Sequence, residues 1–195
     1  IVYVLDESGS MKYSMTEDRK PNNNSNTRRE KAGDAINSLT NQLASNQNLD
    51  TRFSLVAFSG DDNYGESAWD DAELLQDWTG SASSITNKTK PRSNGGTNYQ
   101  AGLRKAKELL KSSRPGALTA VIFVSDGDPT FRYDSDGATM GNGSSDDWNY
   151  NLDAAITEIG TLSAHYFFSV GVGPSRNYQK LKDLKDAAPL VNAEN

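Results

Sequence analysis

Short, nearly continuous apolar runs, rich in β-branched and aromatic residues, recur along the chain. Runs of this length are typical of strands that are covered on both faces of a parallel sheet. They lie at residues 1–5, 53–58, 118–124 and 166–173. A fifth segment, residues 72–79, mixes apolar with polar residues. This mixture predicts a strand at an edge of the sheet.

Helical periodicity fills the stretches between these strands. In residues 28–45, apolar residues recur at spacings of three and four, which places them on one face of a helix. The same pattern indicates helices over residues 98–111, 151–162 and 177–187. Because strands and helices alternate, the chain is predicted to form an α/β domain with a mostly parallel sheet and helices on both faces.

The 195 residues suit one domain spanning residues 1–195. Polar segments at residues 12–27, 60–71 and 131–150 are expected to be surface excursions, the first and last of them insertions. The segment 131–150 is rich in Gly, Ser and Asp. Connections of that length are often functional, so we expect it to lie near a binding site.

Composition narrows the classes of partner. The net charge of −6 and the sequence pI near 4.8 disfavour nucleic acid and anionic membrane surfaces. The chain has no cysteine, which excludes disulfides, thiolate metal sites and cysteine nucleophiles. No run reaches the roughly 18 apolar residues of a membrane span, so direct membrane insertion is not expected.

Oxygen-bearing side chains follow the predicted strands, where open α/β sheets bind their ligands. Such hard donors select Mg²⁺, Ca²⁺ or Mn²⁺ over zinc or copper. We expect Gly9, Gly95 and Gly96 to let the backbone turn sharply around a small ion. The candidate ligands are Asp6, Ser8 and Ser10 in a first loop after strand 1–5, Thr97 in a second loop before helix 98–111, and Asp126 in a third loop after strand 118–124. These three loops are distant in sequence but are expected to converge at one edge of the sheet.

The string "DESGS", with a distant Thr in "GGTNY" and an Asp in "SDG", resembles the von Willebrand factor type A domain. The resemblance is to its metal-ion-dependent adhesion site. The Asp-x-Ser-x-Ser of that family corresponds to Asp6, Ser8 and Ser10, its Thr to Thr97 and its second Asp to Asp126. The resemblance implies a Rossmann-like three-layer α/β/α sandwich with long polar loops at the metal face.

The resemblance also implies a mode of binding. In the family, the serine and threonine hydroxyls hold the cation directly, and the aspartates act largely through water. Because hydroxyls neutralise little of the ion's charge, one position stays open for a Glu or Asp carboxylate of a protein partner. Magnesium is the expected cation, with Mn²⁺ and Ca²⁺ as alternatives.

Plainer interpretations remain for individual residues. Asp6, Ser8 and Ser10 are also residue types that cap helices and form turns. Asp128 follows the site closely and either supports it or serves the turn before Pro129. Trp148 and Tyr150 are either packing residues or neighbours of the metal face that shape ligand specificity.

The resemblance predicts an adhesion module without catalytic activity, on the surface or pilus of a Gram-positive bacterium. An acidic residue of a host extracellular-matrix protein is the expected ligand. The alternative is an intracellular type A domain that acts as an assembly factor. A phosphohydrolase is disfavoured because the chain has neither GxxxxGK[ST] nor GxGxxG, and Glu7-Ser8 breaks a D-x-D pattern.

The end of the chain departs from the family pattern. The family normally adds a strand and a closing helix after the segment that corresponds to helix 177–187. The chain is therefore expected to be a C-terminally incomplete domain, and an affinity switch that depends on that helix is not assigned.

Overall fold

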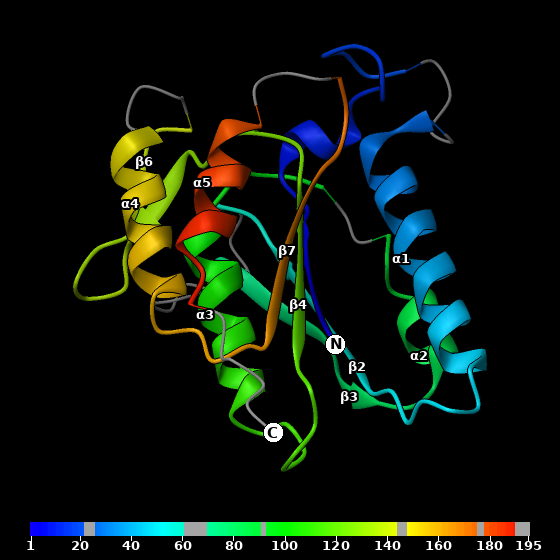
Figure 1. Cartoon of the computed structure of the whole chain (residues 1–195). Helices are drawn as coiled ribbons and strands as arrows, with labels where there is room; N and C mark the ends of the chain where they lie inside the picture. The colour runs from blue at the N-terminus through cyan, green and yellow to red at the C-terminus, as the bar shows by residue number, and fades with distance from the viewer. Residues whose placement is uncertain (22–25, 61–69, 91–92, 144–147, 175–177, 190–195) are drawn as a thin grey trace.

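A computed structural model describes residues 1–21, 26–60, 70–90, 93–143, 148–174 and 178–189. Its middle layer is a five-stranded sheet with the order β3-β2-β1-β4-β7 (Figure 1). β1 pairs in parallel with β2 and β4, and β4 pairs in parallel with β7. β3 is antiparallel and lies at one edge, as its mixed sequence predicts. The strands are β1 Val2–Asp6, β2 Phe53–Phe58, β3 Ala72–Thr79, β4 Ala120–Ser125 and β7 Tyr166–Gly171.

Helices cover both faces of this sheet, which confirms the predicted three-layer arrangement. On one face, α1 (Arg28–Ser45) and α2 (Ala82–Thr86) enclose an apolar cluster around Tyr3, Leu55 and Ile36. On the other face, α3 (Tyr99–Leu110), α4 (Trp148–Ile159) and α5 (Gln179–Ala187) enclose a larger cluster around Phe58 and Phe123. The central strands are therefore buried on both sides, which explains their nearly continuous apolar sequence.

Side-chain caps begin the two helices that border the carboxyl ends of the strands. The Thr27 side chain accepts a hydrogen bond from the Glu30 amide at 3.1 Å and begins α1. The Asn98 side chain accepts one from the Ala101 amide at 3.2 Å and begins α3. Such caps satisfy amides that the first turn of a helix leaves unpaired. They also fix the position of the residue beside each cap, which is Arg28 in α1 and Thr97 before α3.

The predicted excursion over residues 131–150 is partly regular structure, contrary to expectation. It contains a two-stranded antiparallel sheet of β5 (Phe131–Tyr133) and β6 (Thr139–Gly141), and α4 begins at Trp148 rather than residue 151. A 3₁₀ helix, η1 (Gly9–Lys12), and α2 were also not predicted. These elements span three to five residues, too few to show a period. Residues 22–25 and 61–69 of the other excursions lie outside the described residues.

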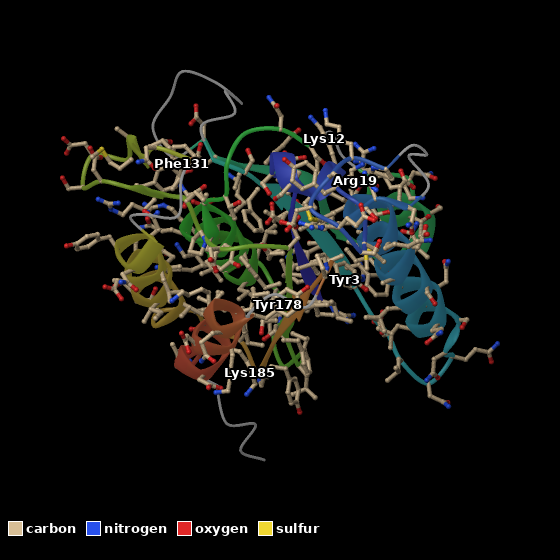
Figure 2. The ribbon with its side chains drawn as sticks, turned by 90° about the horizontal axis from the view of Figure 1, so that it is seen from above. Tyr3, Lys12, Arg19, Phe131, Tyr178 and Lys185 are labelled. Carbon is tan, nitrogen blue, oxygen red and sulfur yellow. The ribbon has the colours of Figure 1, made fainter. Side chains whose placement is uncertain are left out.

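Figure 2 looks down on the edge of the sheet where the parallel strands end. Phe131 lies on one side of this edge, Lys12 and Arg19 lie on the other, and Tyr178 lies nearer its middle. Across the described part of the chain, no helix is both long and apolar enough to cross a membrane.

Candidate metal centre

Two aspartates lie at the ends of neighbouring parallel strands. Asp6 is the last residue of β1, and Asp126 follows Ser125, the last residue of β4. Asp6 is fully buried, and its two carboxylate oxygens have separate donors. One oxygen accepts from the Ser8 amide at 2.7 Å, and the other accepts from the Ser125 hydroxyl at 2.6 Å. The parallel pairing of β1 with β4 therefore brings the first and third predicted loops together.

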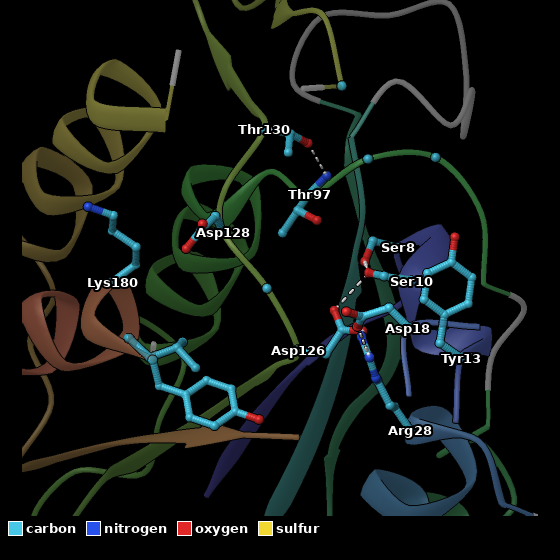
Figure 3. Close-up of a pocket in the computed structure, with 16 residues that line it drawn as sticks. Ser8, Ser10, Tyr13, Asp18, Arg28, Thr97, Asp126, Asp128, Thr130 and Lys180 are labelled. Carbon is cyan, nitrogen blue, oxygen red and sulfur yellow. Dashed lines mark hydrogen bonds and ion pairs between the residues drawn. The ribbon is translucent and has the colours of Figure 1, made fainter. Parts of the chain in front are cut away.

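The serine hydroxyls of the first loop connect it to Asp126 in the third loop. Ser8 Oγ lies 3.1 Å from Ser10 Oγ, and Ser10 Oγ donates to Asp126 Oδ1 at 2.8 Å (Figure 3). The second loop approaches through its backbone, because the Gly9 amide donates to the Gly95 carbonyl at 2.9 Å. Thr97 is held in turn by its own amide, which donates to Thr130 Oγ1 at 2.9 Å.

These groups border one open cavity of about 610 Å³. The cavity includes four of the five predicted ligands, and Asp6 lies buried behind Ser8 and Ser125. The prediction that three distant loops converge at this edge therefore agrees with the geometry. The lining residues are Ser8, Ser10, Tyr13, Asp18, Arg28, Gly95, Gly96, Thr97, Asp126, Gly127, Asp128, Thr130, Gly143, Tyr178, Lys180 and Leu181.

The glycines serve this site in different ways. Gly95 has a φ of 67°, a left-handed turn that glycine adopts readily, as expected. Gly96 is needed for packing instead, because a Cβ there would lie 2.2 Å from the ring of Phe131. The packing against Phe131 is a reason for Gly96 that the sequence did not indicate, and a turn around an ion at this glycine stays a prediction. Its lack of a side chain admits Phe131, which anchors β5 beside the second loop.

Burial perturbs both carboxylates. Desolvation and the nearby charge of Asp126 raise the pKa of Asp6 to about 7, although the hydrogen bonds from Ser125 and Ser8 oppose the rise. Burial also raises the pKa of Asp126, against the hydrogen bonds from Arg28 and Ser10. Each of these buried carboxylates disfavours the negative charge of the other. A cation bound between the loops would offset that repulsion, so the pair of carboxylates favours cation binding.

Arg28 is a further residue of this site, and no motif in the sequence indicates it. Its Nη1 donates to Asp126 Oδ2 at 2.8 Å, and its Nη2 contacts Asp18 Oδ1 at 2.5 Å (Figure 3). Its Nε donates to the Ser14 carbonyl at 3.2 Å. In sequence, Arg28 is one of several charged residues at a helix start, and no spacing distinguishes it. Asp18 and Tyr13, in the excursion 12–27, also line the cavity.

The residues proposed for ligand specificity lie in different places. Asp128 is exposed and lines the cavity beside Thr97 (Figure 3). Tyr150 is not among the lining residues; it lies on α4, is 66% exposed, and packs against the Arg132 guanidinium at 5.8 Å. Trp148 begins α4, and its side chain lies outside the described structure. A specificity role for these three residues stays a prediction.

The donor set fits a hard divalent cation. Within the described residues, no group of three or more His, Cys, Asp or Glu side chains is placed to hold a metal. The cavity instead presents serine and threonine hydroxyls around two buried carboxylates. Such an all-oxygen set suits Mg²⁺ or Mn²⁺ better than it suits softer metals.

Solved structures share this architecture at low sequence identity. The PilB minor pilin from Streptococcus sanguinis, as its D319A mutant, is 17% identical with a TM-score of 0.74, over 95% of this chain and 53% of that one. The SpaC pilus adhesin from Lactobacillus rhamnosus GG is 18% identical with a TM-score of 0.61, over 98% of this chain and 28% of that one. Proximal thread matrix protein 1 from the mussel byssus, with a zinc-occupied MIDAS motif, is 16% identical with a TM-score of 0.55. The match covers 98% of this chain and 43% of that one.

These likenesses show the fold, and this chain spans about half or less of the length of each of those three proteins. No curated protein matches the sequence. A family model does match: that of the von Willebrand factor type A domain covers residues 1–128 and so includes β1, β4 and all five candidate ligands. The chain belongs to the von Willebrand factor type A domain family.

Proposed function

We propose that this domain is a cation-dependent binding module that engages an acidic side chain of a protein partner. The observation that carries the proposal is the bridge from Ser10 Oγ to Asp126 Oδ1 at 2.8 Å. It joins loops that are 116 residues apart in sequence at a cavity lined with oxygen donors. A capping or turn role for Ser10 does not require a partner so distant in sequence. η1 supports this reading, because its N-cap residue Ser8 makes no capping hydrogen bond.

Each residue has a separate part in the proposed site. The hydroxyls of Ser8, Ser10 and Thr97 would hold the cation. Asp6 orients the first loop by accepting a hydrogen bond from the Ser8 amide, and Asp126 orients Ser10 by accepting a hydrogen bond from its hydroxyl. When bound, a divalent cation supplies a Lewis-acidic position for an outside carboxylate oxygen. Mg²⁺ is the proposed native ion because it favours oxygen donors and keeps exchangeable water.

A binding role without catalysis fits the residues of the cavity. The lining includes no His or Cys, and the carboxylates of Asp6 and Asp126 are engaged by donors of the site itself. The two serine hydroxyls lie 3.1 Å apart, and the carboxylate that accepts from Ser10, that of Asp126, is also held by the guanidinium of Arg28, which weakens it as a base. The cavity therefore offers ligands for an ion rather than an activated nucleophile.

The relatives suggest where such a module works. Solved structures with this fold include a minor pilin and a pilus adhesin. We therefore propose a place on the cell surface or pilus of a Gram-positive bacterium, with a Glu or Asp of an extracellular-matrix protein as the ligand. The acidic composition is compatible with such a partner because the cation, not the protein surface, attracts the carboxylate.

A binding screen tests this function. The domain is applied to a panel of immobilised extracellular-matrix proteins in Mg²⁺, then in EDTA, then in Mg²⁺ again. We expect binding that disappears with EDTA, returns with Mg²⁺, and is lost in Ser10→Ala. Ser163→Ala is the matched control, because Ser163 is exposed and lies before β7, at the opposite edge of the sheet. Binding that is indifferent to EDTA would place the interaction on another surface.

A further inference from the structure

Arg28 places a fixed positive charge in the wall of the proposed cation site. Its side chain is 4% exposed, and that of its partner Asp126 is 0% exposed. The two groups lie 2.8 Å apart, in the geometry of a charge-assisted hydrogen bond. Buried ion pairs contribute little net stability compared with apolar packing. Because both residues line the cavity, we infer that the pair acts on the proposed cation site rather than on stability alone.

The surrounding chain is built to hold this guanidinium. The segment before α1 wraps around it, with the Ser14 carbonyl accepting from Nε and Asp18 contacting Nη2. The Tyr13 ring lies 5.6 Å from the guanidinium carbon. Gly173, at the end of β7, leaves room for the side chain: a Cβ there would lie 2.6 Å from Arg28 Nε.

The two oxygens of the Asp126 carboxylate accept hydrogen bonds from different donors. Ser10 Oγ donates to Oδ1, and Arg28 Nη1 donates to Oδ2. The oxygen that faces Ser10 is thus oriented toward the proposed cation position, and the other is held by an internal cation. Asp126 is fixed in its place before any metal enters.

We propose that Arg28 is a positioning residue of the cation site that keeps Asp126 in place in the metal-free protein and lowers the affinity for the incoming cation. The second effect follows from charge. A divalent ion that enters the cavity is repelled by the guanidinium, in surroundings where two of the charged side chains are almost fully buried. Asp18, which is partly exposed, offsets a share of the Arg28 charge. This inference rests on the proposed function of the site.

A role for Arg28 in structure alone predicts a different result. If Arg28 only held the loop together, its removal would weaken both the metal-free fold and the metal site. If it positions Asp126 and opposes the cation, its removal weakens the metal-free fold but strengthens metal binding. The two effects have opposite signs, and that difference of sign distinguishes the roles.

The test is Mn²⁺ calorimetry, together with urea unfolding in EDTA. We expect Arg28→Gln to unfold at lower urea than wild type and to bind Mn²⁺ about tenfold more tightly. Arg28→Lys keeps the charge but loses the planar set of donors, so it is expected to unfold at lower urea than wild type without the tighter Mn²⁺ binding of Arg28→Gln. Lys31→Gln removes an equal charge at an exposed position of the same helix, outside the cavity lining, and is expected to match wild type.

Arg28→Met provides a second neutral replacement if Arg28→Gln does not fold, because its unbranched apolar side chain can fill the buried site of the guanidinium. It too is expected to tighten Mn²⁺ binding. Equal or weaker Mn²⁺ binding by the variant that folds, with wild type binding normally, would overturn the role of Arg28. Absence of Mn²⁺ binding by wild type would overturn the proposed function itself, so the two failures are distinguishable.

Discussion

Asp6 shows how one buried side chain links the fold to the site. It ends β1, it orients the first loop through the Ser8 amide, and it is joined to β4 through the Ser125 hydroxyl. Its burial and the nearby charge of Asp126 raise the pKa of its carboxyl to about 7, so protonation of Asp6 is coupled to the stability of the fold.

The stability of the metal-free protein is expected to depend on pH through Asp6. The carboxyl has a pKa near 3.9 in the unfolded chain and about 7 in the folded chain. Between these values the folded protein holds a proton that the unfolded chain releases, so stability falls as pH rises through this window. Urea unfolding in EDTA at about pH 5 and about pH 8 measures the effect. The stability of wild type relative to Asp6→Asn is expected to decrease at the higher pH, and a constant difference would contradict the assignment.

Metal binding is expected to depend on pH in the opposite direction, with the affinity rising as pH rises. A cation requires the ionised form of Asp6, so its binding displaces the proton held below about pH 7. Mn²⁺ affinity should therefore weaken steadily as pH falls from about 7 to about 5. Calorimetry in buffers of different ionisation enthalpy would count the proton released. An affinity that does not change over this range would mean that Asp6 is already ionised in the metal-free protein.

At the scale of elements, the apolar pattern was informative wherever an element was long. The predicted helix over residues 28–45 agrees with α1, and the strand over residues 53–58 agrees with β2. β5 and β6 were missed because each has three residues and is held by contacts from elsewhere in the chain. The Tyr133 amide, for example, donates to Gln100 on α3, and the Asp71 amide donates to the Tyr133 hydroxyl.

The same distinction applies to the site. Asp6, Ser8, Ser10, Thr97 and Asp126 could be proposed from sequence because they follow a family motif and lie next to predicted elements. Arg28, Ser125 and Thr130 could not, since their roles depend on side-chain directions set by packing. Contacts across 98 to 119 residues, such as those of Arg28 and Ser125, leave no local pattern.

The register of β7 gives a prediction at this scale. Phe167 is 4% exposed and belongs to the larger apolar cluster, whereas Phe168, on the opposite face of the strand, is 52% exposed. Phe167→Ala is expected to lower the free energy of unfolding by about 3–5 kcal/mol. Phe168→Ala is expected to lower it by less than about 1 kcal/mol, because little buried area is lost. Equal losses of unfolding free energy for the two variants, measured by urea unfolding, would contradict the assignment of Phe167 to the buried face and Phe168 to the exposed face.

Phe131 gives a second prediction for an element. Its ring fills space that Gly60 and Gly96 leave open, and this packing anchors β5 beside Thr97. Gly96→Ala is expected to destabilise the protein by about 1–3 kcal/mol through overpacking, and to weaken Mn²⁺ binding by displacing Thr97. Gly116→Ala serves as the comparison, because a Cβ there meets no atom within 4 Å. Because Gly116 has a φ of 72°, any loss of stability in Gly116→Ala comes from backbone strain rather than from overpacking. The Mn²⁺ affinity of this variant is expected to equal that of wild type.

For the whole molecule, the fold explains why residues so far apart in sequence meet at one edge. A parallel sheet with β1 at its centre places the ends of β1 and β4 side by side, and the cap of α3 brings the second loop against them. The sandwich thus supplies a rigid base, and the loops above it supply the chemistry. A minor pilin and a pilus adhesin share this base at 17–18% identity.

The central claim is that one divalent cation binds at Ser8, Ser10 and Thr97 with the support of Asp6 and Asp126. Calorimetric titration with Mn²⁺ tests it most directly, on wild type, Asp6→Ala and the control Asp153→Asn, whose side chain is exposed on α4. We expect one Mn²⁺ per chain for wild type and for Asp153→Asn, and a loss of affinity of at least about tenfold for Asp6→Ala. Equal Mn²⁺ affinity in wild type and Asp6→Ala, or no binding by wild type, would contradict it.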